Sequence, residues 1–167
     1  QQYDLTTGEM TKTIFDATSV SNNADYSGEV NSYTFSKDEN KMLIKTETEA
    51  IYRRSTKANF FVWDRTKKQL NTLSTGGKQR YATFNTQADK VAFVRGNNLF
   101  YKDLNTDKEI QVTTDGKQNE IINGATDWVY EEEFAIARVF EWSPDGQQIA
   151  FLRFDETDVK EFTMTMY

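Results

Sequence analysis

Short runs in which apolar and polar residues alternate dominate the sequence, and long stretches with the 3.6-residue period of an amphipathic helix are missing. One ten-residue unit occurs three times with the same internal spacing: "FSKDENKMLI" at 35–44, "FNTQADKVAF" at 84–93 and "WSPDGQQIAF" at 142–151. Each copy starts with an aromatic residue, continues through a polar turn and ends in an apolar triplet. In the third copy, Pro144 and Gly146 suit the second and fourth positions of a type I turn. The unit therefore predicts a β-hairpin.

A second repeated unit lies between the hairpins and consists of an aromatic strand that ends in Asp, a polar turn and a further strand. It reads "FFVWDRTKKQLNTLS" from Phe60 and "LFYKDLNTDKEIQVTT" from Leu99, and the opening residues resemble a third copy in which Asp4 matches Asp64 and Asp103. The hairpins begin 49 and then 58 residues apart. Four strands in each period of this size are typical of β-propeller blades. A generic antiparallel sandwich is the alternative.

We therefore predict an all-β fold, namely a partial β-propeller of four-stranded antiparallel blades with a short helical insertion. The expected order is the end of a blade with a linker (1–30), a blade (31–75), a second blade (80–115), the insertion (116–140) and the start of a further blade (141–167). This register starts in the outer half of one blade and stops inside another, which leaves unpaired strand edges. We therefore expect the chain to be a fragment of a larger propeller.

Composition excludes several classes of function. The net charge is −6 and the basic residues are scattered, which argues against a nucleic-acid partner. The sequence has no His and no Cys, so a Ser-His-Asp triad, a thiolate metal site and most zinc sites are excluded. No apolar run has the length of a membrane span, and no P-loop or Rossmann glycine motif occurs. We expect no cofactor, no metal and no hydrolase activity from this chain alone.

The connection before the third hairpin contains "DWVYEEE" at 127–133. We expect Asp127 to cap a short helix, because carboxylates in the first turns complement the helix dipole. The helix would carry three consecutive acids: Glu131, Glu132 and Glu133. Considered alone, this spacing favours a solvated acidic patch seated on the propeller by two packing residues, Trp128 and Tyr130.

The segment also resembles a known motif. "DWVYEEE", preceded by "NG" and followed by a "WSPDG" turn, resembles the double-glutamate segment of the dipeptidyl peptidase IV family. These prolyl oligopeptidase-like serine peptidases have an eight-bladed propeller fused to an α/β-hydrolase domain. The resemblance implies that Glu132 and Glu133 bind the free α-amino group of a peptide, whereas Glu131 is not carried over as a ligand. Two carboxylates can accept the three donors of an ammonium group. Three neighbours are expected to support the segment: Asp127, Trp128 and Tyr130.

A second segment, "IYRRSTKANFFVWD" at 51–64, is similar to the family segment in which an Arg reaches a substrate backbone carbonyl. That Arg falls on Arg53, and strand alternation would direct Arg54 to the other face. Arg53 is also expected to pair with the glutamates and hold them in place. The alternative is a pair of exposed arginines on a blade strand.

The resemblance runs from near Phe35 to the C-terminus and implies the substrate-anchoring part of a serine exopeptidase that releases X-Pro or X-Ala dipeptides. The expected partners are peptides with a free N-terminus, an α/β-hydrolase domain of the same protein and a second copy in a homodimer. No G-x-S-x-G nucleophile motif occurs in the sequence. The lack of Cys suggests a bacterial member, and the family implies a periplasmic or secreted protein. A non-catalytic propeller that binds peptides or proteins is the alternative function.

Overall fold

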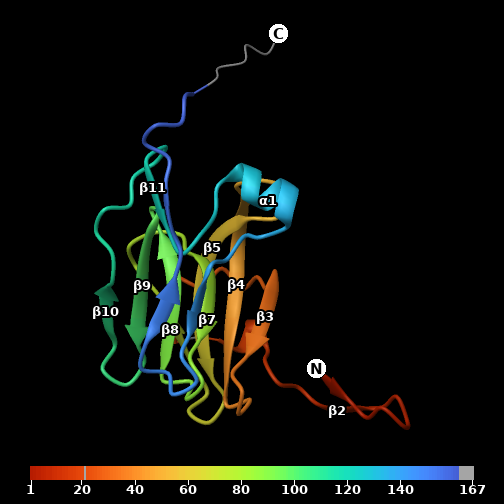
Figure 1. Cartoon of the computed structure of the whole chain (residues 1–167). Coiled ribbons are helices and arrows are strands. Elements are labelled where there is room, and N and C mark those ends of the chain that lie inside the picture. The colour runs from red at the N-terminus through yellow and green to blue at the C-terminus, as the bar shows by residue number, and fades with distance from the viewer. Residues whose placement is uncertain (21, 162–167) are drawn as a thin grey trace.

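The computed structural model describes residues 1–20 and 22–161. Two four-stranded antiparallel sheets form its centre (Figure 1). The first has the order β3-β4-β5-β6 and comprises β3 (Ser32–Phe35), β4 (Lys41–Ala50), β5 (Thr56–Asp64) and β6 (Gln69–Thr72). The second repeats this order with β7 (Arg80–Phe84), β8 (Lys90–Arg95), β9 (Asn98–Asp103) and β10 (Lys108–Gln111). The predicted fold class of four-stranded antiparallel blades is thus confirmed.

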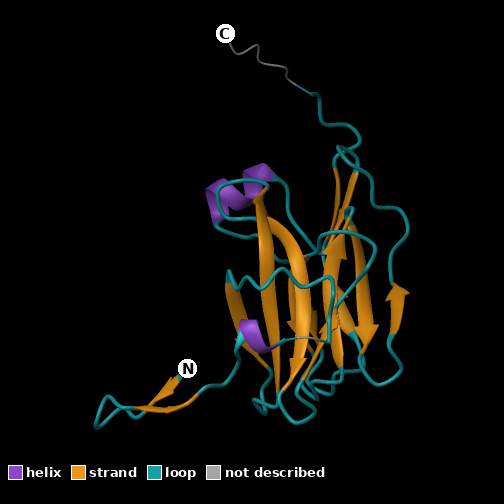
Figure 2. Cartoon of the chain, turned by 180° about the vertical axis from the view of Figure 1, so that it is seen from behind, coloured by secondary structure: helices purple, strands orange, loops and turns teal. Residues whose placement is uncertain are grey.

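The remaining elements flank these two sheets. At the N-terminus lie the hairpin of β1 (Gln2–Tyr3) and β2 (Met10–Lys12) and the 3-10 turn η1 (Ala17–Ser19). A third sheet region and helix α1 follow the second blade: β11 (Ile121–Asn123), α1 (Trp128–Phe134), β12 (Phe140–Trp142), β13 (Ile149–Phe151) and β14 (Arg153–Asp155). Viewed from behind, the β1–β2 hairpin projects away from the sheets, whereas α1 lies over their opposite end (Figure 2). The sequence predicted the helix but not β11, which pairs with β14.

Side-chain oxygens close the turns of both repeated units, which explains their common spacing. In the three predicted hairpins, the second residue of the unit accepts a hydrogen bond from the backbone N–H five residues later, at 2.9–3.0 Å. These acceptors are Ser36, Asn85 and Ser143. In each copy of the second unit, one carboxylate oxygen of the Asp accepts hydrogen bonds from the backbone N–H groups of the residues two and three positions later. These aspartates are Asp4, Asp64 and Asp103. Such local bonds fix a turn wherever the sequence supplies the acceptor.

Apolar residues cover both faces of each blade, and this accounts for the unbroken apolar triplets in the hairpin repeats. On β8, Val91 and Phe93 pack towards the first blade, whereas Ala92 and Val94 pack towards the third sheet region. Successive residues of a strand point to opposite faces, so a strand between two packed layers needs apolar residues at every position. A third cluster packs the first blade against the segment that follows β2, through Ile14, Phe15, Val20 and Tyr26.

The first strands of successive sheets face a common groove. This groove has a volume of about 530 Å³ and is lined by residues of β3, β7 and β12 and of the turns that follow β3 and β7. A shared groove between the first strands is the arrangement found around a propeller axis. Within residues 1–20 and 22–161, no helix has the length and apolar character needed to cross a membrane.

Candidate functional site

The segment that carries the acidic run is closed at its base by contacts between its two ends. Ala125 and Arg138 form an isolated antiparallel bridge. Thr126 donates its backbone N–H to the carbonyl of Ala137 at 3.2 Å and its hydroxyl to the carbonyl of Ile136 at 2.7 Å. Gly124 has a φ of +74°, and a Cβ there would lie 3.2 Å from Val94. The positive φ and the close approach of Val94 therefore favour a glycine where the segment leaves β11.

Helix α1 is short, and its ends are fixed by local contacts. The carboxylate of Asp127 accepts a hydrogen bond from the backbone N–H of Tyr130 at 2.9 Å, so the predicted cap is present. The ring of Tyr130 packs edge-on against Phe154, with the centroids 4.8 Å apart, and ties α1 to β14. Trp128, in contrast, is 54% exposed, and the structure gives it no aromatic partner among the described residues. Asp127 and Tyr130 thus hold the helix, and Trp128 contributes little to its packing.

The predicted Arg53 and Arg54 lie in a turn between β4 and β5, and not on a strand as expected. Strand β4 ends at Ala50, and the backbone N–H groups of Ile51 and Tyr52 both donate to the carbonyl of Ser55. This closed turn breaks the alternation of a strand, so the argument that placed the two arginines on opposite faces does not apply. The turn nevertheless lies directly beside α1 (Figure 1).

The structure brings Arg53 and Glu132 together although they are far apart in the sequence. Arg53 Nε lies 3.2 Å from Glu132 Oε1, with exposed side-chain fractions of 72% and 18%. Glu133, the next residue, is exposed, and the structure shows no ion pair for it among the described residues. Arg53 and Glu132 therefore form an open polar site, and the exposed Glu133 is the next residue of the helix. This site can present acceptors to a cation and a donor to a carbonyl.

Glu131 behaves differently from the two acids that follow it. It is 0% exposed, and its Oε1 accepts hydrogen bonds from the backbone N–H groups of Arg54 at 2.5 Å and Ser55 at 2.9 Å. Burial acts to raise the pKa of Glu131, but the hydrogen bonds from Ser55 and Arg54 outweigh it and hold the pKa below its usual value. Sequence reasoning missed this role, because a run of three acids gives no sign that one of them is buried.

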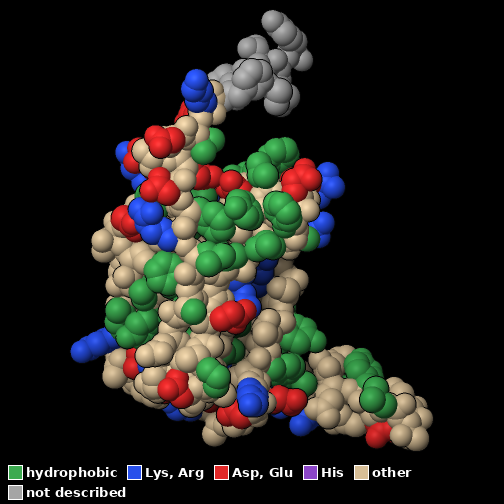
Figure 3. All heavy atoms as spheres, viewed as in Figure 1, with side chains coloured by type: hydrophobic (Ala, Val, Ile, Leu, Met, Phe, Trp, Pro, Cys, Tyr) green, Lys and Arg blue, Asp and Glu red, His purple; other side chains and the backbone are tan. Residues whose placement is uncertain are grey.

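Apolar side chains surround the polar site. Figure 3 shows hydrophobic side chains gathered over α1, with acidic and basic groups at the edge of the helix. The exposed members of this apolar rim are Trp128, Val129, Tyr130, Phe134 and Ile136. Among the described residues, no group of three or more potential ligands is arranged to hold a metal ion. The site is thus a small charged patch within an apolar surface.

Fold and site together define a propeller fragment with a polar site on a short helix, and known proteins place it in a family. Residues 36–167 match the dipeptidyl peptidase IV (DPP IV) N-terminal region, so the chain belongs to this family, and the resemblance seen in the sequence is confirmed.

Individual relatives agree with this assignment. Probable dipeptidyl-aminopeptidase B of Podospora anserina is 40% identical over 136 residues, which are 79% of this chain and 15% of that protein. The protein of the same name from Chaetomium globosum is 38% identical over an equal length. The crystal structure of Porphyromonas gingivalis dipeptidyl peptidase 4 superposes with a TM-score of 0.90 at 38% identity and covers 99% of this chain and 23% of that one.

The chain therefore spans only 15% to 23% of the length of these relatives. Fungal and bacterial proteins both occur among them, so the expected bacterial origin stays a prediction.

Proposed function

We propose that this chain is the part of a dipeptidyl peptidase IV-like serine exopeptidase that holds the free amino terminus of the peptide substrate. Its relatives are named as dipeptidyl peptidases and dipeptidyl-aminopeptidases, which supports a hydrolase as the whole protein. The observation that carries the proposal is the contact of Arg53 with Glu132 beside the exposed Glu133. The nucleophile and its imidazole base are proposed to lie in an α/β-hydrolase domain of the same protein.

The chemistry of the site matches a protonated amine. An ammonium group has three donors, and the carboxylates of Glu132 and Glu133 are two neighbouring acceptors. Adjacent carboxylates repel each other, so the site gains free energy when a cation binds between them. Arg53 neutralises part of this charge and orients Glu132, and the remaining N–H groups at the edge of its guanidinium can donate to a backbone carbonyl of the same peptide. A blocked amino terminus lacks both the charge and the donors.

Such an arrangement would fix which peptide bond an exopeptidase cleaves. If the amine is held at a fixed distance from the nucleophile, only one peptide bond lies in reach, and a dipeptide is released. We propose X-Pro and X-Ala dipeptides as products, with the pocket for the second residue formed largely by the hydrolase domain. A periplasmic or secreted location and a homodimer are further parts of the proposal, by analogy with the family.

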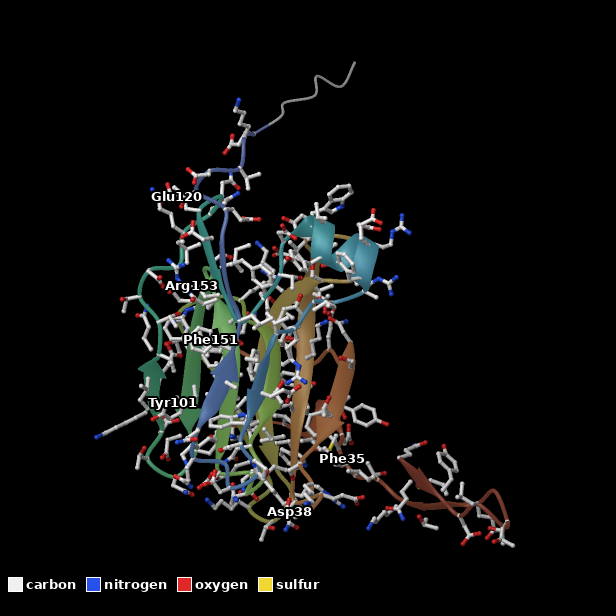
Figure 4. All side chains as sticks on the ribbon, viewed as in Figure 1. Phe35, Asp38, Tyr101, Glu120, Phe151 and Arg153 are labelled. Atoms are coloured by element: carbon white, nitrogen blue, oxygen red, sulfur yellow. The ribbon has the colours of Figure 1, made fainter. Side chains whose placement is uncertain are left out.

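The test uses the full-length protein with Glu132→Gln and Glu133→Gln. Each substitution keeps a neutral acceptor but removes the negative charge that faces the amine. A hydrogen bond to a charged group contributes about 1.5–3 kcal/mol, so we expect a loss of up to about 10- to 150-fold in kcat/KM on an X-Pro anilide. Glu120→Gln is the matched control, because Glu120 lies at the same end of the sheets as α1 but on β11's side (Figure 4) and pairs with Lys117.

Two results would contradict the proposal. The first is an unchanged kcat/KM in both glutamate variants. The second is an equal loss on the free and the N-acetylated substrate, because only the free amine can use the carboxylates. Binding of peptides with a free amino terminus but no turnover by the full-length protein would instead support a non-catalytic propeller.

A further inference from the structure

Glu131 is the one acid of the "DWVYEEE" run that solvent does not reach. It is 0% exposed, and its Oε2 is buried without a hydrogen-bond partner among the described residues. A buried carboxylate is costly unless several hydrogen bonds compensate for the lost water. Its retention inside a segment of the protein that otherwise consists of surface side chains points to a specific structural task.

The task is visible in the bonds that Glu131 accepts. Its Oε1 receives the backbone N–H groups of Arg54 and Ser55, which are 77 and 76 residues away in the sequence. The turn itself uses only the N–H groups of Ile51 and Tyr52, which both donate to the carbonyl of Ser55. The N–H groups of Arg54 and Ser55, at the end of the turn, therefore depend on Glu131 for their acceptor. Both of these hydrogen bonds between helix α1 and the β4–β5 turn end on the same oxygen.

The Arg53–Glu132 contact of the polar site lies next to the hydrogen bond between Arg54 and Glu131, one residue away in the helix and one in the turn. Glu132 follows Glu131 on the helix, Arg53 precedes Arg54 in the turn, and Arg53 Nε lies 3.2 Å from Glu132 Oε1. The Arg53 side chain is largely exposed, so the ion pair by itself is too weak to fix two separate elements. The buried bonds of Glu131 are the stronger link. They set the position of the helix relative to the turn, and hence the position of Glu132 and Glu133 relative to Arg53.

We propose that Glu131 is a positioning residue, whose buried carboxylate sets the distance between Arg53 and the two glutamates that receive the substrate amine. This inference rests on the proposed function of that site. Glu131 does not touch the substrate, and it acts through the backbone of Arg54 and Ser55. A displacement of about 1 Å in a catalytic arrangement can cost up to about 100-fold in rate.

Two conservative substitutions separate position from charge. Glu131→Asp keeps the charge but shortens the side chain by one carbon–carbon bond of about 1.5 Å, so that α1 or the turn must move for the bonds to form. Glu131→Gln keeps the length and the Oε1 acceptor but removes the charge. A positioning role therefore predicts a greater loss for Asp than for Gln, whereas a direct electrostatic role predicts the reverse order.

The experiment measures KM and kcat of the full-length protein on an X-Pro anilide with a free amine. We expect Glu131→Gln to stay within about 10-fold of the unsubstituted protein in kcat/KM, and Glu131→Asp to lose about 10- to 100-fold, mostly through KM. Repeating Glu131→Asp in a Glu132→Ala background closes a double-mutant cycle. Because part of the effect of Glu131 passes through Glu132, the loss caused by Glu131→Asp should be smaller in that background than in the otherwise unsubstituted protein.

Asn85→Ala is the matched control for general loss of stability. Asn85 is 2% exposed, and its Oδ1 also accepts two backbone N–H groups, from Asp89 and Lys90. Asn85 lies in the turn between β7 and β8. The equivalent turn of the first blade, between β3 and β4, contains Asp38 and lies at the end of the sheets remote from α1 (Figure 4). We expect Asn85→Ala to lower the Tm and to leave KM unchanged.

The possible outcomes are distinguishable. A greater loss for Glu131→Gln than for Glu131→Asp overturns the positioning role, as does an equal loss for Glu131→Asp with and without Glu132. In those cases the proposed function still stands if Glu132→Ala itself lowers kcat/KM. If Glu132→Ala has no effect, the proposed function fails, and the role of Glu131 in it fails as well. If Asn85→Ala increases KM as much as Glu131→Asp does, the loss of kcat/KM in both variants comes from reduced stability, and the inference is overturned.

Discussion

Replacement of Arg53 by Ala, with Arg54→Ala beside it, tests whether the arginine of the polar site acts in binding or only in folding. The two arginines are neighbours in one exposed turn and carry the same charge. Arg53 pairs with Glu132, whereas the side chain of Arg54 has no ion pair among the described residues. Arg54 contributes to the site through its backbone N–H, which Ala retains. The pair of variants thus removes the same charge from the turn and differs in one contact.

The expected magnitudes differ for stability and for activity. An exposed ion pair contributes about 0.2–1 kcal/mol to the free energy of unfolding, and Arg53 is 72% exposed, so the Tm should hardly change. A guanidinium that donates to a substrate carbonyl in the proposed complex contributes about 1.5–3 kcal/mol, which is about 10- to 150-fold in kcat/KM. For Arg54→Ala we expect a change of less than about 3-fold in kcat/KM, since only a distant screened charge is lost.

The assay is steady-state hydrolysis of an X-Pro anilide by the full-length protein, with thermal unfolding measured on the same samples. The reasoning is refuted if Arg53→Ala and Arg54→Ala lower kcat/KM equally, because the effect would then come from the net charge of the turn. It is also refuted if the loss of activity in Arg53→Ala follows a loss of several degrees in Tm, because the arginine would then stabilise the fold.

Three further predictions concern local structure. Asp127→Ala should remove about 1 kcal/mol of helix-capping free energy, and hydrogen exchange of the α1 amides should become about 5-fold faster. Asp127→Asn keeps the side-chain acceptor and should change the exchange rate little. The hydrogen bonds from Ser36 and Asn40 lower the pKa of Asp38 to about 2, so the stability that the ionised carboxylate contributes is present above about pH 4 and is lost as the pH falls towards 2. The difference in Tm between the protein and Asp38→Asn should therefore disappear over that range. A difference that stays constant with pH would contradict this prediction. Phe93→Ala should lower the free energy of unfolding, measured by urea titration, by about 3–5 kcal/mol, because the ring is buried and stacks on Phe100. A loss below about 1 kcal/mol would contradict that packing.

Much of the local structure followed from the sequence because short-range bonds determine it. The acceptors at Ser36, Asn85 and Ser143 close turns with residues only five positions away, and a repeat in the sequence therefore gives a repeat in the fold. The cap of α1 by Asp127 spans three residues and was predictable for the same reason. The alternation of apolar residues likewise specified strands, and the apolar triplets indicated sheets that are covered on both faces.

Contacts between distant segments could not be predicted in this way. Nothing near Glu131 in the sequence distinguishes it from Glu132 and Glu133, and only the β4–β5 turn, 76 and 77 residues earlier, decides which of the three acids is buried. Strand β4 ends at Ala50 and is followed by a turn in which Ile51 and Tyr52 donate to the carbonyl of Ser55, so strand alternation could not predict the relative orientation of Arg53 and Arg54. Strand β11 escaped prediction because its partner, β14, lies 30 residues further along the chain.

The sequence by itself thus determined the repeated hairpins and their turns, the capped helix and the family, since each of these depends on residues that are neighbours along the chain. Only the tertiary structure decided which charged groups meet. The free energy of a carboxylate depends on the solvent and hydrogen-bond donors that the fold places around it, and these donors come from another blade.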